Sequence, residues 1–431
     1  MTQTTLSETA TLALKSSVKT QSSSVLWDNL PSYERVLLLQ GPVGPFFAKL
    51  SRYWKSRGAV VKKINFNPGD DWFYPPKDQN TILYKDRLEY WEAFIQNFLV
   101  HNKIQAVFLF GPKRKVHLPI RALCKIYNID LWMLEEGYIR PGYYTLENNG
   151  VNAKSLIAQR DLQDCIDISQ SGQEIPQQFE SYRNMIFGGF AYWLANVTKF
   201  WSYPNYEHHR ALNLKQAYWW IRSFYRHYLY RITERSIKNQ LINKTYFGAD
   251  NQAYFLLPLQ VYDDAQITHN SHYDSIETLI EEVVNSYKNH LQRLRTDIQS
   301  PKTLLIIKHH PMDRGHKNYK KFIDDLSKSL KIEPNIVYVH DIHMPSLLTN
   351  IKGCITANST LGLQALLQGI PVINLSASFY DKPGLTYQQG LDQFWSNPGT
   401  VNPQIAGQFR QYVIQHSQVA GCLYDPRYQI K

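Results

Sequence analysis

The apolar run Leu304 to Ile307 most constrains the fold of this chain, because it leads without a break into a basic cluster and a turn, Lys308-His309-His310-Pro311. A short run of Leu and Ile is typical of a strand buried on both faces of a parallel sheet. Ligands of open α/β sheets bind at the carboxyl ends of such strands, so we expect the cluster at a ligand site. A His before a Pro is also common in ordinary loops, so the choice between a ligand site and an ordinary loop depends on other segments of the chain.

The segment 353–375 has the order strand, turn, helix, strand, which is that of a βαβ unit. Asn358, Ser359 and Thr360 fall at the cap and first turn of its helix. Backbone N–H groups and hydroxyls at a helix start can hold a phosphate, so these residues are candidate phosphate ligands. The alternative is a plain N-cap, which Ser and Thr form in many helices.

Two adjacent acids follow the apolar run Asp130 to Leu134. Glu135 and Glu136 stand at its end, before a glycine. Like charges so close favour sharing of a proton, which suits proton transfer. Successive strand residues point to opposite faces, so only one acid is expected to face a site. An ion pair with Arg140 is the structural alternative.

A third acidic site follows the apolar run Tyr254 to Leu259. Gln260 comes directly after this run, and Asp263 and Asp264 come shortly after it. Read without context, the two Asp residues indicate a solvated turn.

A glycine-containing loop follows the first apolar run, Arg35 to Leu39. Gly41 and Gly44 lie between this run and a predicted helix over 46–57. Glycine lets the backbone approach a ligand closely. The spacing Gly-x-Gly-x-x-Gly is absent, so a nicotinamide enzyme is not expected.

Length and charge predict two cores and an anionic partner. The chain has 431 residues and a formal net charge of +11, which favours nucleic acid, acidic lipid headgroups or a charged substrate. Residues 191–238 mix cations with aromatic side chains, among them Trp219, Trp220, Arg222, Arg226 and Arg231. This mixture fits a helix lying in a lipid headgroup layer. A helical hairpin packed on its own protein and a surface for single-stranded nucleic acid are the alternatives.

Several features predict a cytoplasmic protein that is peripheral to a membrane at most. No apolar stretch reaches the roughly 18–20 residues of a membrane span. Residues 1–24 are rich in Ser and Thr and lack the apolar core of a signal peptide, so a disordered tail is expected. Four scattered Cys residues without metal-ligand spacing fit reduced thiols.

Together these segments resemble the bacterial capsule polysaccharide biosynthesis and export proteins that transfer Kdo in β linkage. The resemblance runs from about Val36 to Tyr424. More distantly, the acidic pair before Gly, the His-Pro and the Ser-Thr are similar to motifs of bacterial sialyltransferases, which also use CMP-activated sugars. The motifs of the main resemblance are Leu39-Gln40-Gly41-Pro42-Val43-Gly44-Pro45-Phe46-Phe47, Asn65-Phe66-Asn67, Phe108-Leu109-Phe110-Gly111, Glu135 to Pro141, Pro258 to Val261 with Asp264, Lys308 to Pro311, Tyr338 to Asp341, Asn358 to Thr360 and Tyr380 to Thr386.

The resemblance implies a mixed α/β chain with two Rossmann-like domains of the glycosyltransferase B type and a helical aromatic and basic insertion. The expected divisions are a disordered tail (1–30), an N-terminal Rossmann-like acceptor-side domain (31–180), a helical membrane-surface and acceptor insertion (181–248), a C-terminal Rossmann-like CMP-sugar-binding domain (249–400) and a C-terminal helical segment (401–431).

The resemblance also implies a reaction, in which the first Kdo moves from CMP-β-Kdo to a (lyso)phosphatidylglycerol acceptor with retention. Asp264 would be the nucleophile, and Glu136, preferred to Glu135, would be the base. His310 would bind or protonate the leaving phosphate. No metal or other cofactor is expected, because basic side chains and a helix start can neutralise that phosphate. The expected donor ligands are Lys308, Gln260, Asn358, Ser359, Thr360 and Arg314.

The expected partners are CMP-Kdo, a phosphatidylglycerol-type lipid, the cytoplasmic face of the inner membrane and other capsule assembly and export proteins, without nucleic acid. Three other functions stay open. The chain could be a noncatalytic lipid- or protein-binding partner in the capsule assembly complex, a transferase that uses another nucleotide sugar, or a nucleic-acid binder.

Overall fold

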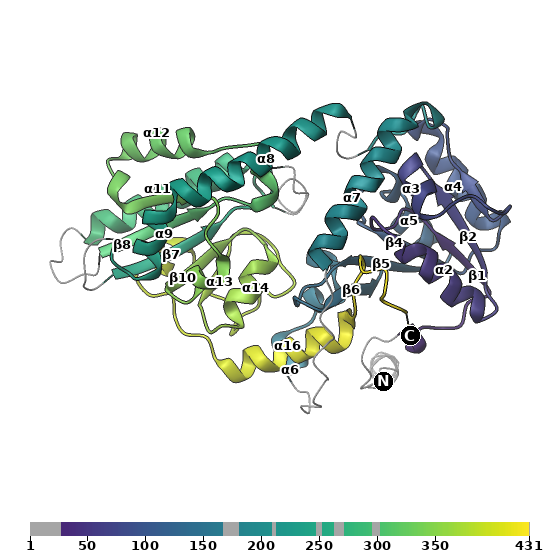
Figure 1. The fold of residues 1–431 in the computed structure, drawn as a ribbon. Coiled ribbons are helices and arrows are strands. Elements are labelled where there is room, and N and C mark those ends of the chain that lie inside the picture. The colour runs from purple at the N-terminus through teal and green to yellow at the C-terminus, as the bar shows by residue number, and fades with distance from the viewer. Residues whose placement is uncertain are drawn as a thin grey trace, which may run out of the picture.

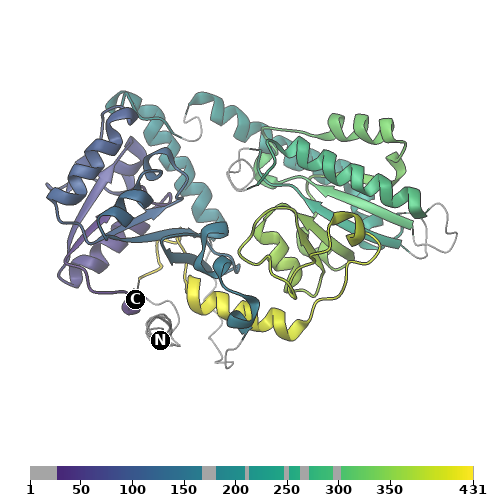
Figure 2. The same ribbon diagram turned by 180° about the vertical axis from the view of Figure 1, so that it is seen from behind.

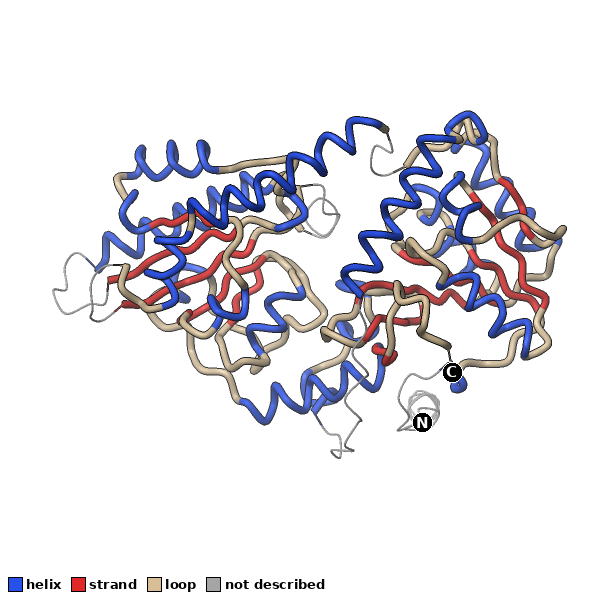
Figure 3. Tube along the Cα trace, viewed as in Figure 1, coloured by secondary structure: helices blue, strands red, loops and turns tan. Residues whose placement is uncertain are grey.

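The computed structural model describes residues 27–166, 181–208, 213–246, 252–262, 271–294 and 302–430, and these form two α/β units, each built on its own sheet (Figure 1). The units lie side by side in the views from the front and from behind (Figures 1 and 2). Figure 3 shows helices against both sheets. The chain is thus a mixed α/β protein with largely parallel sheets, as its sequence predicts.

The first unit has, among the described residues, a seven-stranded sheet in the order β12-β6-β5-β4-β1-β2-β3. Strands β1 to β5 run parallel to one another, and β6 and β12 are each antiparallel to their neighbours. Helix α2 (Phe46–Ser56) packs on one face, and α4 (Trp91–His101) and α5 (Ile120–Ile126) pack on the other. The strands are β1 (Arg35–Leu38), β2 (Val60–Asn65), β3 (Thr81–Leu83), β4 (Ala106–Phe110), β5 (Asp130–Glu136), β6 (Tyr143–Asn148) and β12 (Gln418–Ala420).

The second unit has five parallel strands in the described ranges, in the order β11-β10-β7-β8-β9. Leu304 to Ile307 lie within β8 with no exposed surface, which confirms the predicted buried parallel strand. Helices α13 (Met344–Leu348) and α14 (Thr360–Leu366) cover one face, and α11 (Ile276–Leu294), α12 (Lys320–Leu330) and α15 (Leu391–Phe394) cover the other. The strands are β7 (Gln252–Pro258), β8 (Lys302–Lys308), β9 (Ile336–Val339), β10 (Ile351–Thr356) and β11 (Val372–Asn374).

The helices of residues 181–248 are divided between the two units rather than paired as a hairpin (Figure 1). Helix α7 (Ser181–Thr198) packs on α3 (Pro68–Phe73) of the first unit. There the Asn67 side chain donates to the Tyr192 hydroxyl at 2.6 Å. Helices α8 (Leu214–Thr233) and α9 (Arg235–Ile242) lie along the second unit. The two units meet where Tyr138 stacks on Phe379, with ring centroids 4.2 Å apart, and where α7 contacts α8.

Both ends of the described chain belong to the first unit. Trp27, placed by the sequence in the disordered tail, is instead buried, and its Nε1 donates to the Tyr144 hydroxyl at 2.6 Å. Residues 1–26, the rest of that predicted tail, lie outside the described residues. The C-terminal segment, predicted as helical, starts with α16 (Pro403–Ser417), which packs against α6 (Leu162–Ile166), and then adds strand β12 to the first sheet beside β6.

Candidate functional site

The carboxyl edge of the second sheet gathers most of the donor residues predicted from the sequence. Its strand order reverses between β7 and β10, and a crevice at such a reversal is where open α/β sheets bind ligands. Gln260, just after β7, donates from Nε2 to Oδ1 of Asn358, just after β10, at 3.3 Å. Both side chains are buried, so this pair lies at the reversal itself.

The three basic residues at the end of β8 have different surroundings. Lys308 is buried and donates from Nζ to the carbonyl of His340 at 3.0 Å, and burial lowers its pKa to about 8. His309 is also buried, with Nδ1 2.7 Å from the Tyr338 hydroxyl, and burial lowers its pKa to about 3. His310 is half-buried, and its Nδ1 accepts the Met312 N–H at 3.2 Å. The neutral His310 ring therefore carries its proton on Nε2, which can donate to a phosphate.

A second buried imidazole follows β9, and helix α8 holds it. The Nδ1 of His340 lies 2.6 Å from a carboxylate oxygen of Glu234, and the same carboxylate accepts the backbone N–H groups of His340 and Asp341. The ring of Tyr230 stacks on His340 with centroids 3.7 Å apart. Sequence reasoning missed Glu234, since no local pattern joins residues so far apart.

Arg314, a predicted donor ligand, lies beside this imidazole and is ion-paired. Its guanidinium is 2.6 Å from Asp341, whose other oxygen is 2.6 Å from Nδ1 of His227. The carbonyl of Arg314 accepts from Arg226 at 2.8 Å. Residues on α8 thus contact the loops that follow β8 and β9.

The helix start after β10 has the predicted cap. Ser359 Oγ accepts the N–H of Leu361 at 3.2 Å, and α14 begins at Thr360. The plain N-cap is therefore present, and Ser359 and Thr360 stand beside Asn358 at the same sheet edge.

The predicted nucleophile Asp264 and its neighbour Asp263 lie outside the described residues. Tyr262 is the last described residue before them, and its N–H donates to Asp313 at 3.1 Å. Asp313 ends the turn that His310 begins, so the chain leaves the described part beside the His310 loop.

The two acids of β5 point to opposite faces of the first sheet, as predicted. Glu135 pairs in register with Thr145, and Glu136 with Tyr144. Glu136 accepts a hydrogen bond from the hydroxyl of Tyr424. Arg140, the alternative partner of the acids, donates its Nε–H to the carbonyl of Gly137 at 2.9 Å.

The predicted glycine-rich loop lies at the carboxyl edge of the first sheet, between β1 and β4. A Cβ at Gly41 would lie 2.7 Å from the ring of Phe47, and Gly44 has a positive φ of 114°. The Gly41 carbonyl accepts from Arg114, which follows β4, at 2.9 Å. The loop therefore needs glycine for close packing at one position and for backbone conformation at the other.

Helix α8 carries the predicted membrane residues, but they face in several directions. Trp219 packs on the second unit, with its ring centroid 5.3 Å from that of His316. Trp220 contacts Trp193 of α7, with ring centroids 5.3 Å apart. The solvent-facing residues recur at helical spacing and are 50 to 75% exposed; we call them the outer stripe, Leu214, Tyr218, Ile221, Tyr225, Tyr228 and Ile232.

Two absences concern only the described part of the chain. None of its helices combines the length and apolarity needed to cross a bilayer. Within the same ranges no three His, Cys, Asp or Glu side chains are grouped to hold a metal ion.

A family model and two sequence relatives agree with one another. A family model described as "Capsule polysaccharide biosynthesis protein" matches residues 105–424. The chain is 33% identical over 413 residues to the capsule polysaccharide modification protein LipB of Neisseria meningitidis, covering 92% of this chain and 93% of LipB. It is 33% identical over 402 residues to the capsule polysaccharide export protein KpsS of Escherichia coli, covering 92% and 98%. Among solved structures, KpsC of Thermosulfurimonas dismutans, a β-Kdo 2,7 transferase, matches with 12% identity and a TM-score of 0.41, covering 86% of this chain and 89% of that one.

Proposed function

Since this chain belongs to the capsule polysaccharide biosynthesis protein family, we propose that it is a retaining glycosyltransferase that moves the first β-Kdo from CMP-Kdo to a phosphatidylglycerol-type lipid. The supporting observation is the gathering of four predicted residues at one edge of the second sheet: Gln260 and Asn358 lie at the strand-order reversal, and Lys308 and His310 lie at the end of the next strand. Two Rossmann-like domains of the glycosyltransferase B type are part of the same proposal.

In this proposal the CMP phosphate lies between the ends of β8 and β10. Lys308 and the Nε2–H of His310 would meet its charge from one side, and the start of α14 from the other. Gln260 would orient the donor, beside Asn358. These groups would neutralise the departing CMP without a metal ion, so activity should survive a chelator.

The proposed chemistry is a double displacement. The Asp264 carboxylate would attack the anomeric carbon of Kdo while the bond to the CMP phosphate breaks, and His310 would donate a proton to the departing phosphate. The acceptor hydroxyl would then attack the same carbon from the opposite side, lose its proton to Glu136 and release Asp264. Two inversions give net retention.

The outer stripe of α8 supports docking on a membrane surface. Six apolar or aromatic residues on one helix face are exposed, and α8 contains no acid while Lys215, Arg222, Arg226 and Arg231 supply cations. Apolar side chains at the level of the acyl chains and cations among phosphates are typical of interfacial helices. The proposal therefore includes docking on the cytoplasmic face of the inner membrane, where anionic lipid is available.

The test is mass analysis of a short-chain phosphatidylglycerol after incubation with freshly generated CMP-Kdo. We expect a single added Kdo with the unmodified protein and with Asp263→Asn, and no product with Asp264→Asn. Product from Asp264→Asn would remove Asp264 as the nucleophile. No product from folded, CMP-binding protein would instead favour another nucleotide sugar, or a noncatalytic role in capsule assembly.

A further inference from the structure

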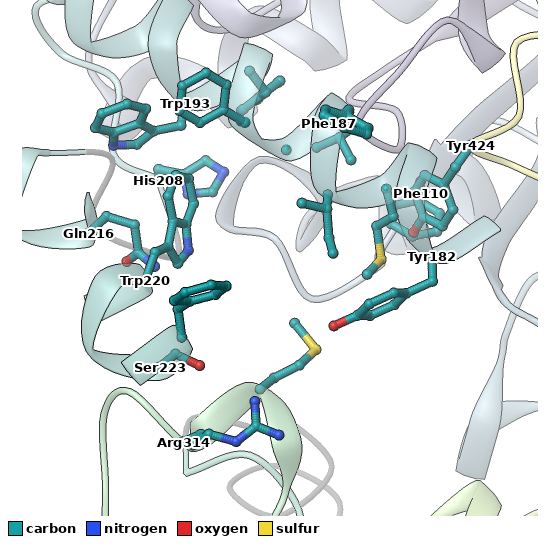
Figure 4. A pocket seen from close by; sticks show the side chains of 18 of the residues that line it. Phe110, Tyr182, Phe187, Trp193, His208, Gln216, Trp220, Ser223, Arg314 and Tyr424 are labelled. Atoms are coloured by element: carbon teal, nitrogen blue, oxygen red, sulfur yellow. The ribbon is translucent and has the colours of Figure 1, made fainter. Parts of the chain in front are cut away.

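A large cavity lies between the two units and is walled mainly by α7 and α8 (Figure 4). Its volume is about 820 Å³, within the range of roughly 300–1,000 Å³ that small-molecule sites occupy. Gly41 and Arg114 line it from the first unit, and Met312 and Arg314 line it from the second. The cavity therefore adjoins both sheet edges that carry predicted site residues.

The walls of the cavity are apolar and open to water. Phe187 on α7 is 65% exposed, Phe224 on α8 is 66% exposed, and Met312 is 51% exposed. Figure 4 shows the aromatic side chains of Phe187, Trp193 and Trp220 around the cavity. Large apolar side chains gathered around an open cavity mark a surface that binds an apolar group, because leaving them in water is unfavourable.

The cavity also has a cationic margin. Arg114 makes no ion pair among the described residues, and its guanidinium donates to the Gly41 carbonyl. Arg314 is paired with Asp341, yet its Nε is buried and has no hydrogen-bond partner in the described ranges. Because Arg314 is neutralised by Asp341, the cation at the margin is Arg114, and an apolar chamber with such a guanidinium at its edge matches an amphipathic anion.

The cavity borders the outer stripe of α8. Phe224 lines the cavity, and its ring contacts that of Tyr228 of the stripe, with centroids 4.9 Å apart. A chain that leaves a bilayer beside α8 would pass Phe224 on its way to Trp220 and Trp193. This path argues for an occupant drawn from a membrane.

We propose that the cavity holds one acyl chain of a glycerophospholipid, with the phosphate of its headgroup near Arg114. The inference rests on the proposed function in that the lipid would be the acceptor. It adds that the acyl chain leaves the bilayer and enters the protein. The headgroup would then lie between Glu136 of the first unit and His310 of the second.

Gly189 of α7 offers a way to block the cavity without disturbing the fold. It lines the cavity, and a Cβ there would meet no atom within 4 Å. Replacing a helical glycine with a larger residue also favours the helix. Gly407 of α16 is a matched control, because it is likewise helical with open space at its Cβ but does not line the cavity.

The experiment is calorimetric titration with octanoyl, decanoyl and dodecanoyl lysophosphatidylglycerol, each below its micelle concentration and without donor. Burial of each methylene should tighten binding about fourfold, so each step of two carbons should gain about fifteenfold. Gly189→Trp should abolish this dependence on chain length, Gly407→Trp should keep it, and both should bind CMP as the unmodified protein does.

Binding that ignores chain length, or that Gly189→Trp leaves unchanged, would overturn the cavity proposal, as would failure of all three lipids to bind. The result is independent of transfer. A protein that shows the chain-length dependence but never forms a Kdo product would keep the cavity and lose the proposed reaction. A protein that transfers Kdo but whose lipid binding does not depend on chain length would keep the proposed reaction and lose the cavity proposal.

Discussion

The carboxylate of Glu234, at the end of α8, lies 2.6 Å from Nδ1 of His340, at the end of β9. The same carboxylate accepts two backbone N–H groups from that loop. One side chain therefore joins the proposed membrane helix to the loop beside the proposed donor site.

Replacing Glu234 with Ala should destabilise the second unit. The change leaves buried donors of His340 and Asp341 without their acceptor, which should lower the free energy of unfolding by about 2–3 kcal/mol. Urea denaturation measures the loss. Glu207→Ala is the control, because Glu207 pairs with Lys115 on the surface and should change stability little. Equal effects of the two variants would mean that the Glu234 contacts contribute no more stability than a surface ion pair.

Lys308 should make stability depend on pH. Burial lowers its pKa from the ordinary 10.5 to about 8, so between these values the unfolded chain binds more protons and the stability contributed by this group rises with pH. Lys308→Met should remove this rise. The free energy of unfolding of the unmodified protein, relative to that of the variant, should therefore increase by about 2 kcal/mol from pH 7 to pH 9.5. Urea denaturation at both pH values checks it.

Lys63 is a control that separates the pH dependence of stability from donor binding. It is also buried with a pKa lowered to about 8, but it lies on β2 of the first sheet. Lys63→Met should show the same loss of pH dependence and leave CMP affinity unchanged, whereas Lys308→Met should weaken CMP binding at pH 7. If both variants bind CMP alike, Lys308 does not meet the donor phosphate.

Ser359 can distinguish a plain helix cap from a phosphate site. Ser359→Ala should cost about 1 kcal/mol, because the Leu361 N–H loses its acceptor. Ser359→Asp restores the cap but adds a negative charge, so it should keep stability and weaken CMP binding at least tenfold. Asn402→Asp at the start of α16 is the control and should leave CMP binding unchanged. Unaltered CMP affinity in Ser359→Asp would leave Ser359 as a cap alone.

Two arginines of α8 should contribute to vesicle binding. Arg222→Gln with Arg231→Gln should weaken binding to phosphatidylglycerol vesicles by about 2 kcal/mol, or roughly thirtyfold, at low salt. Arg226 is left intact because it also bonds to the Arg314 carbonyl. Flotation with vesicles is the measurement, and Arg121→Gln with Lys125→Gln on α5 matches the change in charge. Equal loss in the two double variants would indicate a general charge effect rather than docking through α8.

Local patterns predicted much of the fold and part of the candidate site. The strands that contain Leu304 and Leu131 and the helix that begins at Phe46 are confirmed, because short apolar runs and their flanking turns determine these elements locally. The Ser359 cap is likewise confirmed. The gathering of Gln260, Asn358 and Lys308 followed from one general property of parallel sheets, whose carboxyl ends lie at one edge.

The relations that sequence could not supply join distant segments. Nothing near Tyr192 indicates that α7 belongs to the first unit, since its partner Asn67 lies far away in the chain. The Glu234 and His340 contact is similar. The basic and aromatic composition of α8 also gave no way to tell Trp219, which packs on His316 of the second unit, from Ile221, which faces water.

The return of the chain to the first sheet determines the order in which the units can be completed during synthesis. Gln418 of β12 donates from Nε2 to Thr145 of β6 at 3.0 Å, across 273 positions of sequence. All strands of the second sheet lie between these two residues, so that sheet has all its strands while the first still presents β6 as an open edge. An open edge strand is a template for pairing with other chains. A nascent chain that stalls between residues 375 and 417 should therefore contain all strands of the second sheet and a first unit prone to aggregation.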